Sequence, residues 1–299
     1  MTTSKDTTRA DSPSMLARSI MLMKPVTWFP PTWAFLCGAV ASGAVVWSAP
    51  DMLRMVLGMI MAGPILCGMS QVVNDYYDRD VDAINEPDRL IPSGKVSMQQ
   101  VFITIVVLIV LGFGIGLYLG RWVSLLVVVG FGLAIAYSAP PFRAKQNGWY
   151  GNTLAAISYE GLAWVAGHLA FAMISPQSLL IAALYSLGTH GIMSINDYKS
   201  IDGDRKAGVR TIPVQYGPKG AAWLIVSTMV IAQVLVIAAF VVWGNGLIAI
   251  ILTGILLAQV PFQYRFIKEP MAFYLFFSAF GVLIFVIGML IAAIGLRGI

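Results

Sequence analysis

Residues 101–119, VFITIVVLIVLGFGIGLYL, decide the fold because they form an unbroken apolar run without a charged residue. A helix needs about 20 apolar residues to cross the hydrocarbon core of a bilayer. A strand of a membrane barrel would instead alternate between lipid-facing and interior residues. This stretch therefore predicts a transmembrane helix.

Eight further stretches of the same kind are found along the 299-residue chain. The nine predicted spans are 26–48, 52–73, 101–119, 122–139, 152–174, 178–195, 221–243, 246–264 and 271–295. Charged residues make up only 11% of the chain, whereas a soluble domain carries about 25%. This excludes a soluble enzyme, a disordered chain and a disulfide scaffold. We predict an all-α integral membrane protein, with a tail at 1–24 that holds no cleavable signal peptide and a nine-helix domain at 25–299.

The basic residues predict the orientation of the spans. The N-terminal tail and the even-numbered loops carry 16 of the 19 Lys and Arg residues, and the other side carries only Arg54, Arg121 and Arg297. Cytoplasmic loops are enriched in basic residues, so we expect the N-terminus and the even-numbered loops in the cytoplasm and the C-terminus outside. The net charge of +5 then reflects topology, and no nucleic-acid partner is expected.

Acidic residues gather in two related clusters, after the second and the sixth predicted spans. Residues 74–82 read NDYYDRDVD and residues 196–204 read NDYKSIDGD, with identical residues at five of the nine positions. A single charge run would most simply be a solvated loop. A duplicated run at the ends of membrane helices is better interpreted as a pseudo-repeat of two facing half-sites.

Helical geometry places most polar residues of each cluster on one side of the helix. At about 100° per residue they share an arc of about 100°. The first set is Asn74, Asp75, Asp78 and Asp82, and the second is Asn196, Asp197, Ser200 and Asp204, while Asp80 and Asp202 point elsewhere if the helix continues. Oxygen ligands without a nearby His or Cys favour Mg²⁺, which binds one or two carboxylates together with phosphate oxygens. Two opposed clusters therefore predict a site for a diphosphate.

Basic and aromatic side chains near the clusters extend the candidate site. The cations expected to neutralise the remaining phosphate charge are Arg89, Arg143, Lys145, Lys206 and Arg210. The aromatic rings at the same level, which are candidates to stabilise a developing cation, belong to Tyr76, Tyr137 and Tyr198. The alternative is that these residues only set topology or form an interfacial belt.

These motifs resemble a known family, the UbiA-type intramembrane prenyltransferases. The resemblance lies in NDYYDRDVDAINEPDRLIPSGKVS at 74–97, YSAPPF at 137–142 and DRKAGVRTIP at 204–213. Within that family the chain is most similar to chlorophyll and bacteriochlorophyll synthases, through INEPDRLIPSG at 84–94 and KPVTWFPPTWAFLCGA at 24–39. The resemblance covers essentially the whole chain.

The resemblance implies a nine-helix fold and a reaction. A geranylgeranyl or phytyl group would pass from its diphosphate to the propionate carboxylate of (bacterio)chlorophyllide, at the last stage of (bacterio)chlorophyll biosynthesis. It also implies a bacterial inner membrane, contact with lipid, and possible complexes with other pigment-biosynthesis or photosystem-assembly proteins.

The resemblance further implies roles for individual residues. Two Mg²⁺ ions would bridge the diphosphate; their ligands in the first cluster would be Asn74, Asp78 and Asp82, beside Asp75, and in the second Asp197 and Asp204. The second cluster departs from the family's DxxxD pattern, because Ser200 stands four residues before Asp204, so Asp202 remains an alternative ligand. Arg143 and Lys145 match the family's diphosphate-binding cations.

The ionisable residues Glu160 and His168 lie inside the fifth predicted span, and His190 lies inside the sixth. Such groups are functional by default in a membrane. Glu160 is a candidate to orient or deprotonate the acceptor, and a histidine to ligate the magnesium of a chlorin. The alternative is a buried hydrogen bond between helices.

Other functions remain open from the sequence. A quinone (4-hydroxybenzoate-type) or haem prenyltransferase would use the same scaffold with another acceptor. A transporter would also contain repeats and intramembrane acids, although its site would lie near the midplane rather than at the cytoplasmic face. A pigment-binding protein without catalysis would need no paired acidic clusters.

Overall fold

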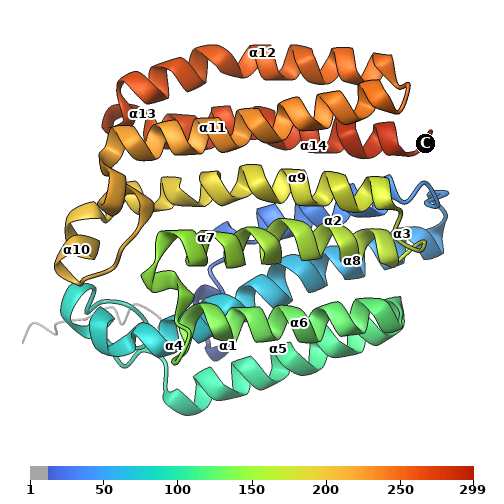
Figure 1. Cartoon of the computed structure of the whole chain (residues 1–299). Coiled ribbons are helices and arrows are strands. Elements are labelled where there is room, and N and C mark those ends of the chain that lie inside the picture. The colour runs from blue at the N-terminus through green and yellow to red at the C-terminus, as the bar shows by residue number, and fades with distance from the viewer. Residues whose placement is uncertain (1–12) are drawn as a thin grey trace, which may run out of the picture.

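The computed structural model describes residues 13–299, which form an all-helical bundle with the long helices packed side by side (Figure 1). The elements of the first half are α1 (Met15–Leu22), η1 (Pro25–Thr27), α2 (Phe29–Ala41), α3 (Ala49–Ile60), η2 (Met61–Cys67), α4 (Gly68–Asn85), α5 (Met98–Leu119) and α6 (Arg121–Ser138). The next are η3 (Ala144–Gln146), α7 (Gly148–Ala156), η4 (Ile157–Leu162), α8 (Ala163–Leu169), α9 (Pro176–Met193), η5 (Ser194–Lys199) and α10 (Ile201–Lys206). The last are α11 (Ile212–Val242), α12 (Gly246–Lys268), α13 (Pro270–Phe276), η6 (Phe277–Gly281) and α14 (Val282–Leu296).

Three π-helical turns, η2, η4 and η6, each join two α-helices end to end. We call such a continuous run of helices a rod. A π turn inside an α-helix changes the direction of the side chains that follow it and often marks a functional site. The turn η4 carries Glu160.

Seven helices within residues 13–299 are long and apolar enough to cross a membrane. They contain seven of the nine predicted spans. The other two predictions correspond to α2, which has 13 residues, and to the rod of α7, η4 and α8, which contains Glu160 and His168. Exposed apolar side chains such as Val106 and Ile250 cover the outside of the bundle, as expected for a surface in contact with lipid.

Small residues allow α2 and α8 to pack closely. A Cβ atom added to Gly38 would lie 1.9 Å from the carbonyl oxygen of Trp164, and one added to Gly167 would lie 2.0 Å from that of Phe35. Neither position has room for a side chain, so the two backbones pack directly against each other. This contact holds the rod that carries η4 in the centre of the bundle.

The predicted helix boundaries differ from the structure at both acidic clusters. The second span was expected to end at residue 73, but α4 continues to Asn85 and carries the whole first cluster. The expectation that the second cluster lies on one side of a continuous helix is wrong. There η5 is a 3₁₀-helix, the backbone leaves helical geometry at Ser200 (φ −120°, ψ 8°), and α10 begins after it.

Part of the predicted N-terminal tail forms a helix. The side chain of Gln100 on α5 donates to the Met15 carbonyl oxygen (2.9 Å), and Arg18 donates to the Lys95 carbonyl oxygen (2.9 Å). Leu22 is buried. These contacts hold α1 near the first acidic cluster, whereas the predicted tail residues Lys5, Asp6, Arg9 and Asp11 lie outside the described residues.

Candidate active site

Both acidic clusters lie at the same end of the bundle. Figure 1 shows the C-terminal part of α4 and the short helix α10 at the left end, opposite the C-terminus. Tyr137, on α6, lies within electrostatic range of both Asp78 and Asp197. The tertiary structure therefore brings together two clusters that are about 120 residues apart in the chain.

One side of the first cluster faces the loop after α6. The Lys145 Nζ lies 2.6 Å from Asp78 Oδ2 and donates to Asn74 Oδ1 at 2.9 Å. The Arg143 Nη2 donates to Asp78 Oδ1 at 3.2 Å. The Ser138 hydroxyl also donates to Asn74 Oδ1, at 3.4 Å. Asn74 and Asp78 thus form one ligand face, with two cations beside it.

The other side of the first cluster faces two different cations. The Lys24 Nζ lies 2.6 Å from Asp75 Oδ1, and the Arg89 Nη1 donates to Asp82 Oδ2 at 2.9 Å. Arg89 also donates to Glu86 through its Nε atom. Asp75 and Asp82 are buried, at 8% exposure each. A buried carboxylate needs such a partner, because an unpaired buried charge is costly.

A short backbone bridge holds the loop of Arg143 and Lys145 against the segment after the second cluster. The Gly148 amide donates to the Arg210 carbonyl oxygen (2.8 Å), and the Arg210 amide donates to that of Gln146 (2.9 Å). A Cβ atom on Gly148 would lie 2.6 Å from the Ile212 nitrogen, so this position requires glycine. The bridge couples the cations of one cluster to the backbone of the other.

The second cluster is smaller and has fewer partners. The Ser200 hydroxyl donates to Asp204 Oδ2 (2.7 Å), and Asp197 lies close enough to Asp204 for their charges to interact. Asp202 is exposed and pairs with Arg205. Lys206 and the Arg210 side chain are exposed too, so only their position near the cluster supports their predicted role.

Burial changes the proton affinity of two groups that lie outside the membrane-spanning helices. Burial lowers the pKa of Lys145, and its hydrogen bond to Asp78 opposes that change. Burial raises the pKa of Asp204, and the Ser200 hydroxyl opposes it. Both directions follow from removing a charge from water.

The three predicted tyrosines occupy different places. Tyr137 lies within electrostatic range of Asp78 and Asp197. Tyr76 packs against Tyr77 and Phe102, on the side of α4 that faces α5. Tyr198 is buried, stacks on Tyr274, and donates to the Pro218 carbonyl oxygen (2.6 Å). Tyr137 is therefore the tyrosine near both clusters, whereas the rings of Tyr76 and Tyr198 pack against neighbouring aromatic side chains.

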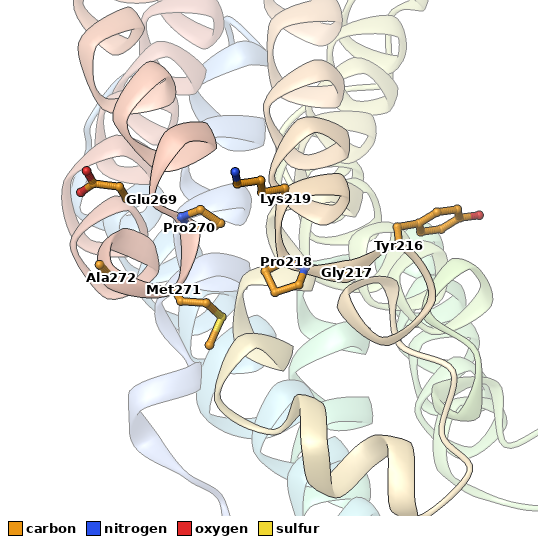
Figure 2. Close-up of a pocket in the computed structure, with 8 residues that line it drawn as sticks. All are labelled: Tyr216, Gly217, Pro218, Lys219, Glu269, Pro270, Met271 and Ala272. Atoms are coloured by element: carbon orange, nitrogen blue, oxygen red, sulfur yellow. The ribbon is translucent and has the colours of Figure 1, made fainter.

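A groove of about 580 Å³ lies next to Tyr198, between the start of α11 and the start of α13 (Figure 2). Its lining consists of Tyr216, Gly217, Pro218, Lys219, Glu269, Pro270, Met271 and Ala272. Figure 2 shows Lys219 and Glu269 on opposite sides of the groove and Tyr216 pointing away from it. None of the predicted site residues lines this groove, so it is separate from the clusters.

The three intramembrane ionisable groups are all buried. His168 lies near the end of α8 and donates to the Met173 carbonyl oxygen (3.2 Å), far along the rod from the clusters. The His190 Nδ1 contacts the Thr153 hydroxyl (3.2 Å), and its ring lies 5.5 Å from that of Trp149. Glu160 Oε2 accepts a hydrogen bond from Thr189 (3.2 Å).

The donor set fits magnesium that is bound jointly by protein and substrate. Within residues 13–299, no three His, Cys, Asp or Glu side chains lie close enough together to hold an ion by themselves. Mg²⁺ commonly uses one or two carboxylates and completes its coordination with phosphate oxygens and water. Asp78 and Asp197, which both lie within electrostatic range of Tyr137, are oxygen donors of this kind.

Sequence reasoning missed three polar residues of the site. Lys24 was taken only as a topology determinant, and its αL backbone (φ 48°) turns it toward Asp75. Ser138 was not singled out, although it follows Tyr137 directly. Ser200 was considered only as a substituted ligand, whereas it orients Asp204. The signal available was that each lies inside a motif, Lys24 in KPVTWFPPTWAFLCGA, Ser138 in YSAPPF and Ser200 in NDYKSIDGD.

The sequence profile of the UbiA prenyltransferase family matches residues 28–271. This match covers most of the chain. The chain belongs to the UbiA prenyltransferase family. It is therefore a multi-pass membrane protein of a family that transfers prenyl groups, and the transporter alternative is excluded.

Curated relatives of this family member are similar over nearly its whole length. It is 57% identical to the bacteriochlorophyll synthase 34 kDa chain of Chloroflexus aurantiacus, over 94% of this chain and 90% of the relative. It is 42% identical to the bacteriochlorophyll synthase 33 kDa chain of Cereibacter sphaeroides, over 93% and 92%. It is 41% identical to the chloroplastic chlorophyll synthase of Oryza sativa, over 92% and 75%.

Solved structures of this family share the fold. A structure described for digeranylgeranylglyceryl phosphate synthase in membranes superposes with a TM-score of 0.73, at 20% identity, over 95% of this chain and 99% of the other. A UbiA homolog from Archaeoglobus fulgidus bound to DMAPP and Mg²⁺ superposes with a TM-score of 0.67, at 18% identity, over 90% and 99%. At these identities the likeness supports the fold alone.

Proposed function

We propose that this protein transfers a geranylgeranyl or phytyl group from its diphosphate to the propionate carboxylate of (bacterio)chlorophyllide. The observation that carries this proposal is the 57% identity to a bacteriochlorophyll synthase chain over 94% of the sequence. The site supports it, because two acidic clusters and a set of cations meet at one end of an apolar bundle. The same identity argues against the quinone and haem acceptors.

The carboxylates would hold Mg²⁺ together with the substrate diphosphate. The proposed ligands are Asn74, Asp75, Asp78, Asp82, Asp197 and Asp204, with two ions per site. Bound Mg²⁺ supplies positive charge that stabilises the diphosphate as a leaving group. A UbiA homolog from Archaeoglobus fulgidus is described as bound to DMAPP and Mg²⁺, and we propose the same ion for this member of the family.

The basic residues would exchange carboxylate partners for phosphate oxygens. Lys145 and Arg143 contact Asp78, and Lys24 and Arg89 contact Asp75 and Asp82, so all four are already at the site before substrate binds. Arginine is well suited to bidentate phosphate contacts. Lys206 and Arg210 would contribute from the exposed side of the second cluster.

The reaction then breaks one carbon–oxygen bond and forms another. The electron pair of the allylic bond leaves with the diphosphate, and a lone pair of the propionate carboxylate forms the new ester bond. The ring of Tyr137, which lies within electrostatic range of Asp78 and Asp197, would stabilise the developing allylic cation, and the apolar helices would exclude water from it. No proton needs to be removed from an ionised carboxylate.

The membrane topology completes the proposal. Nine crossings follow if α2 and the rod of α7, η4 and α8 each traverse the bilayer alongside the seven longer helices. The N-terminus and both clusters would face the cytoplasm of a bacterial inner membrane, and the C-terminus the periplasm. The pseudo-repeat of the clusters and a complex with other pigment-biosynthesis or photosystem-assembly proteins stay predictions.

Product analysis with detergent-solubilised protein tests the function. Geranylgeranyl diphosphate and Mg²⁺ are supplied with bacteriochlorophyllide in one tube and with 4-hydroxybenzoate in another, and the extracts are chromatographed. We expect an esterified chlorin in the first tube only, and its loss with EDTA. A prenylated benzoate would refute the acceptor, and absence of product from both would refute the reaction.

A further inference from the structure

A row of polar contacts runs between the α7–η4 rod and α9. Asn152 donates to the Ser194 hydroxyl (2.7 Å), Thr153 contacts His190 (3.2 Å), and Thr189 donates to Glu160 (3.2 Å) further along the rod. Ser194 stands three residues before Asp197. We call these three pairs the polar seam. It connects the second acidic cluster to the interior of the membrane domain.

Glu160 is the last residue of the polar seam, and only one of its two carboxyl oxygens forms a hydrogen bond. Its Oε2 accepts a hydrogen bond from Thr189, whereas Oε1 is buried and has no hydrogen-bond partner among residues 13–299. The residue is only 5% exposed. Among residues 13–299 no Lys, Arg or His forms an ion pair with it. An isolated carboxylate inside a membrane is costly, so a neutral carboxyl group with a free donor or acceptor atom is the favoured form.

The π turn η4 places this carboxyl group between the helices of the two half-sites. Tyr159, the preceding residue, contacts Ser70 (3.2 Å) and Gln71 (3.1 Å) on α4, just before the first cluster. Glu160 points to α9, which leads to the second cluster. Tyr159 also lies within electrostatic range of Tyr137. A molecule held between the two clusters therefore lies close to η4.

The distance of Glu160 from the second acidic cluster matches the size of the acceptor's ring. Its partner Thr189 precedes Asp197 by eight residues, which is about 12 Å along a helix. With the propionate at the diphosphate end, the rest of a tetrapyrrole ring would extend over that distance. Its peripheral ketone and ester groups are hydrogen-bond acceptors, and a neutral carboxyl group is a matching donor.

We infer that Glu160 binds the acceptor, donating a hydrogen bond from its carboxyl group to a ring carbonyl of the chlorin. This contact would orient the ring so that the propionate carboxylate faces the allylic carbon, and it would make Glu160 a determinant of acceptor specificity. The inference rests on the proposed function. An unsatisfied buried polar atom is expensive unless a ligand satisfies it, and Oε1 has no partner among residues 13–299.

Steady-state kinetics of the full-length protein test this role. Glu160→Leu removes the donor, and we expect the KM for chlorophyllide to rise about tenfold, while the KM for the prenyl diphosphate stays within about twofold. Glu160→Gln keeps a donor of the same size and should restore the acceptor KM to near wild type. Gln233→Leu is the matched control, because Gln233 on α11 is also buried with an unpartnered oxygen but lies outside the polar seam.

A second comparison changes the substrate instead of the protein. With chlorophyllide whose ring ketone has been replaced by a methylene group, which removes the acceptor oxygen, we expect the wild type to lose about tenfold in kcat/KM and Glu160→Leu to lose nothing further. Equal losses in both proteins would overturn the inference. If Glu160→Leu does not fold, a wild type that fails to discriminate the ketone from the methylene compound overturns it equally well.

The outcomes separate this inference from the proposed function. If the wild type esterifies no chlorin, the proposed function fails. If the wild type is active but Glu160→Leu keeps both KM values, or shifts both equally, only the role of Glu160 fails.

Discussion

The two acidic clusters have five of nine residues in common, yet they differ in backbone and in partners. The first lies on the regular helix α4, and four cations from three other segments contact it. The second spans a 3₁₀ turn and a short helix, with a serine as the partner of Asp204. The first cluster is thus held in place before a ligand binds, whereas the second has fewer contacts to hold it.

This difference indicates that the two clusters contribute differently to the binding of a metal diphosphate. A cluster whose carboxylates are already paired with cations keeps its geometry when a metal diphosphate replaces those partners. A cluster on a broken helix can adjust to complete the coordination. We therefore expect substitutions in the first cluster to be more severe than equivalent ones in the second.

The largest effect is expected from Asp78→Ala. This change removes the carboxylate that both Arg143 and Lys145 contact, and it leaves those cations unpaired. We expect kcat/KM to fall by about a thousandfold or more, with membrane insertion intact. Asp82→Ala should behave similarly. Asp80→Ala, on the same helix but exposed, is the control, and full activity of Asp78→Ala would refute the metal site.

A smaller loss is expected from Asp197→Asn. The amide keeps the size of the side chain but loses the charge, which lies within electrostatic range of Tyr137 as Asp78 does. We expect kcat/KM to fall about a hundredfold, measured by product formation at saturating Mg²⁺. Asp202→Asn changes an exposed carboxylate in the same cluster and should have little effect. A larger loss than for Asp78→Ala would reverse the proposed ranking of the clusters.

Lys145→Met should mainly weaken diphosphate binding. Its Nζ contacts both Asn74 and Asp78 and is largely buried, whereas Arg143 contacts Asp78 from a more exposed position. We expect the KM for the prenyl diphosphate to rise about tenfold and the acceptor KM to change little. Lys199→Met, at an exposed position of the second cluster, serves as the control. An unchanged diphosphate KM would assign Lys145 a purely structural role.

Ser200→Ala should have the smallest effect of the four. It removes one hydrogen bond to Asp204, which corresponds to about 1 kcal/mol, or about fivefold in kcat/KM. Ser200→Thr retains the hydroxyl and should recover most of the activity. If the alanine variant is as active as the wild type, Asp204 does not depend on this contact.

The hydropathy of the chain predicts the long helices well but not their ends at the site. The stretch 101–119 became α5, Met98–Leu119, almost as expected. The stretch 52–73 became part of a rod that continues to Asn85, because the polar residues after 73 are stabilised by cations from other segments and do not end the helix. Local hydropathy contains no information about those distant partners.

The identical residues of the two clusters predict side-chain positions less well than hydropathy predicts the helices. Tyr76 and Tyr198 occupy the same position in the two clusters, but one packs against α5 and the other lies under α11. Tyr137, which belongs to neither cluster, lies within electrostatic range of Asp78 in the first and Asp197 in the second. When two copies of a sequence lie on different types of helix, their equivalent side chains take different positions and do not form two equivalent sites.

The amino-acid sequence by itself determined that this is a helical membrane protein with two acidic clusters, because apolar runs and charge spacing are local properties of the chain. Only the tertiary structure decided that Lys145 reaches Asp78 across 67 residues, that Lys24 reaches Asp75 across 51, and that Glu160 ends with a free oxygen in the bundle. These contacts depend on how α2, α4, α7 and α9 pack. The packing follows from close approaches such as Gly38 with Trp164, which become visible only when all helices are in place.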